Sequence, residues 1–171
     1  MDYAFAYVEE NGICSEEDYE YTAKNGKCQH TNCDSVVELE ECYDVPSNNE
    51  MALQEAVSKQ PVSVAIEADL RVFQMYHSGV ITGETCGTNL DHGVLVVGYG
   101  TDDESSVDYW LVKNSWGEAW GEDGYVRIER SNKTEDQGTC GIAMQPSYPI
   151  VADTKQFGYG FNCGDCGLSY Q

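Results

Sequence analysis

Apolar residues recur at helical spacing at the start of the chain. Met1, Phe5 and Val8 fall on one face of residues 1–11, and Gly12 follows directly. Residues three or four positions apart share a face of an α-helix, and a glycine commonly ends one. We therefore predict a helix over residues 1–11.

A second helix is predicted over residues 50–59, where apolar residues again share one face. Asn48 or Asn49 is its candidate N-cap, because an asparagine side chain accepts a hydrogen bond from the first turn. Pro61 prevents the helix from continuing, since proline lacks the backbone N–H that a helix interior requires. The stretch before this helix, residues 19–42, is rich in turn-forming residues and is expected to be irregular.

After Pro61 the apolar period changes from helical to two. Val62, Val64 and Ile66 alternate with less apolar positions, as in a strand with one buried face. Further strands are expected at residues 92–99, 109–113 and 124–130. The acidic run at residues 102–106 is expected to form an exposed loop. This succession of strands predicts an antiparallel barrel or sandwich.

Composition and charge limit the classes of function. The chain has 171 residues, of which 41% are hydrophobic, so it can bury a core. Its formal charge of −21 at pH 7 would repel nucleic acid and anionic membranes, and neither is an expected partner. No stretch is long and apolar enough to span a bilayer. The acidity indicates either a well-solvated surface or adaptation to an acidic compartment.

Eight cysteines indicate folding in an oxidising compartment. Zinc binding is the alternative, and Cys163 and Cys166 have the spacing of half a zinc site. No second pair of ligands with such spacing accompanies them, so we expect no metal site.

The residues with the clearest chemistry are His92 and Asn114. His92 lies in LDHGV at residues 90–94, and Asn114 begins NSWGEAWG at residues 114–121. A histidine that shuttles a proton needs its ring held in one tautomer, and an asparagine oxygen can do this without adding charge. His30 and His77 lack such surroundings and are expected to be structural or surface residues.

In this order of motifs, the chain resembles the papain-like cysteine proteases of the cathepsin L type over roughly residues 1–150. The resemblance implies an α+β, papain-like fold. Residues 1–43 would be the end of the helical left domain, and residues 44–150 most of the antiparallel β-barrel right domain, which carries His92 and Asn114. Residues 151–171 depart from the family pattern and are expected to be an extension.

The family's nucleophilic cysteine precedes the histidine, in a C-G-S/A-C-W/Y signature that is absent from these residues. Residues 1–5, MDYAF, resemble an internal part of the family sequence, so we expect a C-terminal fragment whose cysteine lies upstream. The glutamine of the family's oxyanion hole would also lie upstream. Cys163 and Cys166 are an alternative nucleophile site, but only five residues follow, too few for the long helix that carries the family's thiol.

Five further positions acquire a role through the resemblance. Trp116 would shield the hydrogen bond between the catalytic pair, and Trp120 would line the leaving-group side of the cleft. Ala65, Gly93 and Gln145 would line the pocket for the second residue before the cut. Two small residues and an uncharged Gln145 favour apolar or aromatic side chains there; the alternative is that Gln145 is simply exposed.

The resemblance also implies that Cys86 and Cys140 form a disulfide and that Cys28 pairs with an upstream cysteine. The partners of Cys14, Cys33 and Cys42 stay open. One N-x-S/T sequon, at Asn132, is either a glycan acceptor or a chance occurrence.

The expected function is therefore that of a cysteine endopeptidase, inactive as this segment alone, without cofactor or metal. Its partner would be a polypeptide substrate, and the complete protein would be monomeric and lysosomal, vacuolar or extracellular. The first alternative is a non-catalytic papain-like homologue whose nucleophile is replaced and whose cleft serves binding. The second is a small acidic, cysteine-rich binding protein.

Overall fold

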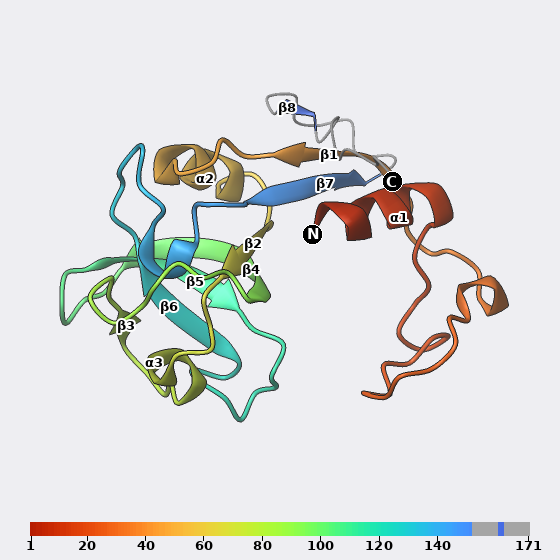
Figure 1. Cartoon of the computed structure of the whole chain (residues 1–171), viewed down its shortest axis with the longest axis horizontal. Helices are drawn as coiled ribbons and strands as arrows, with labels where there is room; N and C mark the ends of the chain where they lie inside the picture. The colour runs from red at the N-terminus through yellow and green to blue at the C-terminus, as the bar shows by residue number, and fades with distance from the viewer. Residues whose placement is uncertain (152–160, 163–171) are drawn as a thin grey trace. The chain divides into compact units, whose positions relative to one another are not determined.

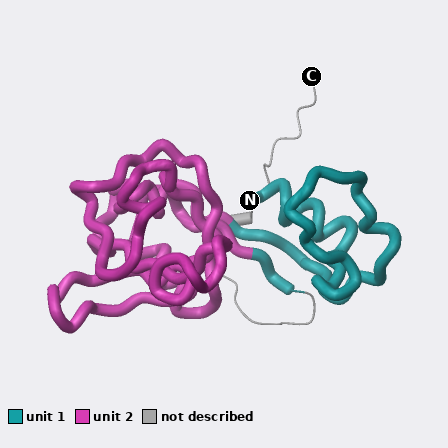
Figure 2. Tube along the Cα trace, turned by 90° about the horizontal axis from the view of Figure 1, so that it is seen from below, with its two compact units in different colours: residues 1–43, 149–171 teal, residues 44–148 magenta. Residues whose placement is uncertain are grey.

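The computed structural model describes residues 1–151 and the backbone of residues 161–162. The chain divides into two compact units (Figure 2). Unit 1 comprises Met1–Tyr43 and Pro149–Gln171, and unit 2 comprises Asp44–Tyr148. The predictions for Cys163 and Cys166 lie outside the described residues.

Unit 1 begins with helix α1 (Asp2–Asn11), which confirms the first predicted helix. Gly12 ends it with a φ of 68°, and its N–H donates to the carbonyl of Val8. A β-carbon at Gly12 would lie 2.0 Å from Oγ of Ser35, so only glycine fits there. A short 3-10 helix, η1 (His30–Asn32), follows in the otherwise irregular stretch.

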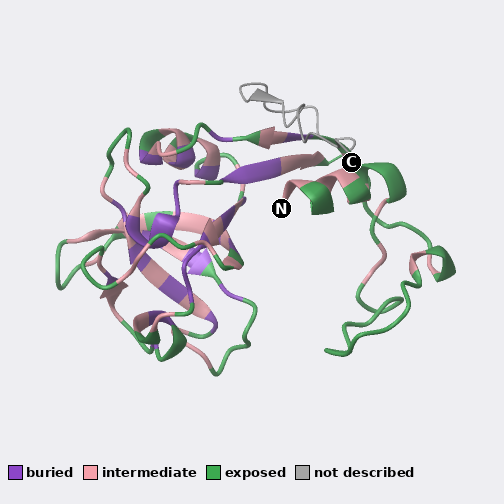
Figure 3. Cartoon of the chain, in the orientation of Figure 1, coloured by how far each residue is buried: buried purple, intermediate pink, exposed green. Residues whose placement is uncertain are grey.

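A disulfide between Cys14 and Cys33 holds this stretch together, a pairing that the sequence left open. Among the described residues of unit 1, Cys42 is the one with a buried side chain, and most of the others are exposed (Figure 3). A strand, β1 (Leu39–Asp44), begins inside the stretch predicted to be irregular. That prediction is wrong for its last residues, because LEECYD has too few apolar residues to show a clear alternation.

Unit 2 is built on a sheet whose strands have the order β3-β6-β5-β4-β2-β7 (Figure 1). The strands are β2 (Val62–Ile66), β3 (Val80–Ile81), β4 (His92–Thr101), β5 (Asp108–Lys113), β6 (Tyr125–Glu129) and β7 (Ser147–Val151). The end of β7 belongs to unit 1, where the next strands in order are β1 and β8 (Phe161–Asn162). The four strands predicted for this unit are confirmed, whereas β3 and β7 were not predicted.

One strand pair corrects the expectation of a purely antiparallel barrel. β2, β4, β5 and β6 pair antiparallel in succession, but β3 pairs with β6 in parallel. The sheet is therefore mixed. The two-residue strand Val80–Ile81 is too short to show an alternation of period two, so no sequence pattern predicted it.

Helix α2 (Glu50–Val57) confirms the second predicted helix. The side chain of Asn49 caps it by accepting a 3.0 Å hydrogen bond from the N–H of Ala52. Two further short helices of unit 2 were not predicted: α3 (Arg71–Gln74) and the 3-10 helix η2 (Thr139–Gly141). Among the residues that the structure describes, no helix is long and apolar enough to cross a membrane.

The core of unit 2 lies between the sheet and these helices (Figure 3). In β2, the alternate residues Val62, Val64 and Ile66 are fully buried, as their period predicted. Trp110 of β5 and Phe73 of α3 are the largest side chains with no exposed surface. This core fixes the ends of β2, β4 and β5, where the candidate site lies.

Candidate active site

His92 is the first residue of β4, opposite Ile66 at the end of β2. The neighbouring Asp91 ties these two strand ends together. Its N–H donates to the carbonyl of Ile66 at 3.0 Å, and its carboxylate accepts from the N–H of Ala68 at 2.8 Å. Asp91 therefore fixes the backbone from which the imidazole of His92 projects, a role that its place in a motif alone did not reveal.

Asn114 directly follows β5, and its N–H donates to the carbonyl of Gly124 at 3.0 Å. Its Oδ1 lies 2.9 Å from Nε2 of His92, although the two residues are 22 positions apart. Oδ1 also accepts the N–H of Ser115 at 2.8 Å. Since an amide oxygen only accepts, Nε2 of His92 carries the proton in this contact. The pair is shielded from water on its asparagine side, where Asn114 is only 8% exposed.

A cluster of four aromatic side chains adjoins the imidazole on one side. The ring of Trp116 lies 5.1 Å from that of His92, at an interplanar angle of 31°. Phe73 contacts both tryptophans, with centroid distances of 5.5 Å to Trp116 and 5.0 Å to Trp120. Trp120 also packs against Tyr76 at 5.6 Å. Of this cluster, Trp116 and Phe73 contact the imidazole itself and restrict its rotation.

Trp116 is 39% exposed and thus lies at the edge of this cluster, whereas Phe73 is fully buried beneath it. Phe73 and Tyr76 were missed by the sequence reasoning, because α3 has only four residues and shows no helical period. The spacing of Phe73 and Tyr76 was the one feature of the sequence that could have indicated this aromatic cluster.

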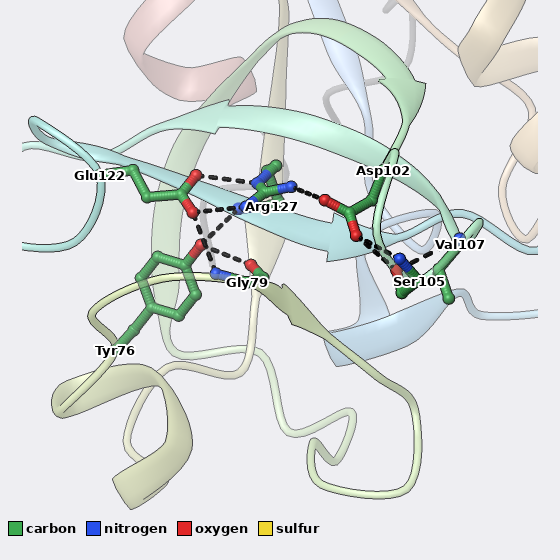
Figure 4. A network of polar contacts seen from close by, with 7 residues as sticks. All are labelled: Tyr76, Gly79, Asp102, Ser105, Val107, Glu122 and Arg127. Carbon is green, nitrogen blue, oxygen red and sulfur yellow. Dashed lines mark hydrogen bonds and ion pairs between the residues drawn. The ribbon is translucent and has the colours of Figure 1, made fainter.

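A network of charged groups supports the turn that carries Trp120 (Figure 4). Arg127 of β6 donates to both carboxylate oxygens of Glu122, at 2.9 and 2.7 Å, and also binds Asp102. Glu122 in turn accepts the N–H of Gly79 at 3.0 Å, and the hydroxyl of Tyr76 donates to the carbonyl of Gly79 at 2.6 Å. The network joins the loop after α3 to the segment that follows Trp120.

These contacts shift the pKa values of the groups involved. Hydrogen bonds from Ser105, together with Arg127, lower the pKa of Asp102 to about 2. Hydrogen bonding from Arg127 also lowers the pKa of Glu122, while burial raises the pKa of Tyr76 to about 12. The ion pairs of the network therefore stay charged in mildly acidic solution.

Two of the three pocket residues implied by resemblance lie on neighbouring strands beside His92. Ala65 of β2 is paired with Gly93 of β4, one position from the pair of Ile66 and His92. An added β-carbon at Gly93 would meet no atom within 4 Å, so open space lies in front of it. Gln145 lies between η2 and β7 and is exposed.

The disulfide implied by resemblance is present. Cys86 and Cys140 are bonded, with their Cα atoms 4.9 Å apart, and they join the loop before β4 to η2. Cys28 is exposed and has no disulfide partner within the described part of the chain. Within that part, no group of three His, Cys, Asp or Glu residues is placed to hold a metal ion.

The family model of papain family cysteine proteases matches residues 1–150 of the chain. The chain belongs to this family. Papain-family relatives include cysteine protease 1 of Oryza sativa subsp. japonica, 57% identical over 152 residues, which cover 88% of this chain and 31% of that protein. Cysteine proteinase COT44 of Brassica napus is 55% identical over 152 residues, covering 88% of this chain and 45% of that protein. The chain thus spans less than half the length of these relatives.

Solved structures of papain-family proteins share the fold. The bromelain protease from Ananas comosus, in complex with the E64 inhibitor, aligns with a TM-score of 0.79 and 42% identity, covering 86% of this chain and 67% of that one. Digestive procathepsin L 3 of Tenebrio molitor aligns with a TM-score of 0.76 and 43% identity, covering 88% and 48%. The resemblance seen in the sequence is therefore confirmed, and a coincidental match in an unrelated binding protein is excluded.

Proposed function

We propose that the complete protein is a cysteine endopeptidase in which His92 and Asn114 act with a cysteine outside these 171 residues. The observation that carries this proposal is the 2.9 Å contact between Nε2 of His92 and Oδ1 of Asn114. It engages one ring nitrogen and leaves Nδ1 to face a nucleophile. Two findings support a catalytic cysteine elsewhere in the protein. Residues 1–150 match the papain family of cysteine proteases, and the chain spans less than half the length of its Oryza and Brassica relatives.

The chemistry follows from this geometry. The imidazole takes the proton of the thiol, and the resulting imidazolium stabilises the thiolate, which is the nucleophilic form. The thiolate attacks the peptide carbonyl, and His92 then gives its proton to the leaving amine as general acid. Asn114 keeps the ring oriented through both steps. An amide suffices because the thiolate already balances the charge of the imidazolium.

The cysteines of unit 2 near this pair offer no alternative nucleophile. Cys86 and Cys140 are both consumed in their disulfide. A thiol bound in a disulfide cannot act as a thiolate, so the sulfur must come from another part of the protein.

For the substrate, the proposed pocket is formed by Ala65, Gly93 and Gln145. Ala65 and Gly93 face each other across β2 and β4. Ser63 of β2 pairs with Ser147 of β7, and Gln145 lies two residues before Ser147. A row of two small residues and one uncharged amide suits an apolar or aromatic side chain of the substrate.

The domain organisation and the location of the complete protein are proposed from its family. Residues 1–43 are proposed as the end of the left domain, and residues 44–150 as most of the right domain. Unit 2 also begins at Asp44, but it ends at Tyr148, so Pro149 and Ile150 belong to unit 1. Two disulfides are typical of proteins that fold in the secretory pathway. The proposed location of the complete, monomeric protein is therefore the vacuole or lysosome, or the extracellular space.

A peptidyl electrophile that alkylates active-site thiols tests the proposal in the full-length protein. The expected result is irreversible loss of peptide hydrolysis, with one label per molecule and protection by excess substrate. A protein that binds peptide but shows neither hydrolysis nor labelling would instead be the non-catalytic homologue. Labelling that is unaffected by substrate would mark an unrelated surface thiol and contradict the proposal.

A further inference from the structure

We propose that Asn132 is the acceptor of an N-linked glycan. Asn132, Lys133 and Thr134 form an N-x-T sequon and are all exposed, on the segment that follows β6. The backbone of Asn132 has a φ of 58°, a conformation that asparagine adopts more readily than most residues. The acceptor thus lies in an exposed segment on the surface of unit 2, where a bulky group finds room.

Asn132 lies at the end of the sheet remote from the catalytic pair. Its Nδ2 donates to the carboxylate of Asp108 at 3.0 Å, and Asp108 pairs with Thr101 at the far end of β4 and β5. Asn114 follows the opposite end of β5. Five residue steps of strand separate these ends, roughly 17 Å at the usual rise. A glycan on Asn132 therefore leaves the approach to His92 open.

The modification is compatible with the contacts of the asparagine. Oδ1 of Asn132 accepts from the guanidinium of Arg130, and the sugar does not take up that oxygen. In the transfer, Nδ2 attacks the anomeric carbon of an oligosaccharide held on a lipid diphosphate. The bond from that carbon to the phosphate oxygen breaks, Nδ2 loses one proton, and the lipid diphosphate leaves. Nδ2 keeps one N–H for Asp108.

The two disulfides indicate the compartment in which this reaction takes place. Cys14–Cys33 and Cys86–Cys140 require an oxidising environment during folding, and the secretory pathway provides both that and N-glycosylation. The inference rests on this route and not on the catalytic activity, because a non-catalytic homologue would acquire the same glycan.

The test is mass spectrometry of the full-length protein after expression through the secretory pathway of a plant cell. The peptide with Asn132 should carry a glycan, and release by a peptide N-glycosidase should convert the amide into an acid at that position. Thr134→Ser keeps the sequon and should keep the glycan. Thr134→Ala and Asn132→Gln each remove the sequon and should abolish it.

Thr134→Ala is the matched control, because it retains Asn132 and the backbone bridge between Thr134 and Asn49. The electrophoretic mobility of Thr134→Ala should equal that of the wild type after enzymatic deglycosylation. Recovery of the secreted wild-type peptide only in unmodified form would overturn the inference. So would a mobility that is the same for Thr134→Ala and untreated wild type.

Discussion

The indole Nε1 of Trp110 donates a 2.9 Å hydrogen bond to Oε1 of Glu50, a carboxylate with no exposed surface. The other carboxylate oxygen accepts the N–H of Ser131 at 2.8 Å and is also bound by the Ser131 hydroxyl. The contacts join α2, β5 and the segment after β6. A buried carboxylate is tolerated only when donors satisfy it, so these three donors explain why a charged residue sits in this core.

Glu50→Gln should lower the free energy of unfolding by about 1–3 kcal/mol, because its amide NH2 would face a donor and leave buried groups unpaired. Urea unfolding followed by tryptophan fluorescence measures this. Glu55→Gln on the same helix is the control, since Glu55 makes an exposed pair with Lys59 and should cost less than about 1 kcal/mol. Equal losses in both variants would contradict the role of Glu50.

Removing the Cys86–Cys140 disulfide should destabilise unit 2 by about 4 kcal/mol in the entropic model. The bond closes a loop with a sequence separation of 54, and the Cys86→Ala/Cys140→Ala variant opens it. The readout is again tryptophan fluorescence, because all three tryptophans lie in unit 2. Cys14→Ala/Cys33→Ala opens a loop of unit 1 and should leave this transition in place; an equal shift would show that the two disulfides act on one folding unit.

The pair of Asp102 and Arg127 should stabilise unit 2 down to acidic pH. Asp102 has a pKa of about 2 in the folded protein, below the ordinary 3.8, so its contribution is present above the ordinary value and is lost as pH falls through the folded one. The difference in unfolding free energy between wild type and Asp102→Asn should therefore be constant from about pH 7 to 5 and shrink between about pH 4 and 2.

Asp103→Asn is the matched control for this profile, because Asp103 is exposed in the same loop and carries the same charge. It should differ little from wild type throughout. A difference for Asp102→Asn that does not change with pH would mean that the carboxylate does not act through its charge.

Gln145→Glu in the full-length protein should shift cleavage towards substrates with arginine as the second residue before the cut. The change would place a negative charge in the proposed pocket, from which leucine and phenylalanine substrates gain nothing. The ratio of kcat/KM for arginine and leucine substrates measures the shift. An unchanged ratio, or a wild type that already prefers arginine, would remove Gln145 from the pocket.

Sequence reasoning found the elements that carry a period. The helices at residues 2–11 and 50–57 and the strands β2, β4, β5 and β6 were predicted because apolar positions recur at regular spacing along them. His92 and Asn114 were found from two motifs, but the sequence did not show that these two segments lie side by side. The closeness of His92 to Asn114 depends on the register of β4 on β5, which only the assembled sheet sets.

The parts that were missed are short or depend on contacts between distant residues. β3 and α3 have two and four residues, fewer than a repeat requires. Nothing in the sequence distinguishes Arg127, Glu122 and Asp102 from ordinary surface residues. They form a network only because one strand and two loops bring them together. Phe73 supports the imidazole from such a short helix.

The central claim is that His92, oriented by Asn114, is the acid and base of peptide hydrolysis. The most direct measurement is kcat/KM of the full-length protein with His92→Ala, Asn114→Ala and, as control, the exposed His77→Ala. His92→Ala should reduce kcat on the order of a million-fold, as loss of the histidine does in other triad enzymes. Asn114→Ala should reduce kcat by a factor roughly a hundred times smaller. His77→Ala should match wild type. Hydrolysis that survives His92→Ala at the wild-type rate would contradict the account.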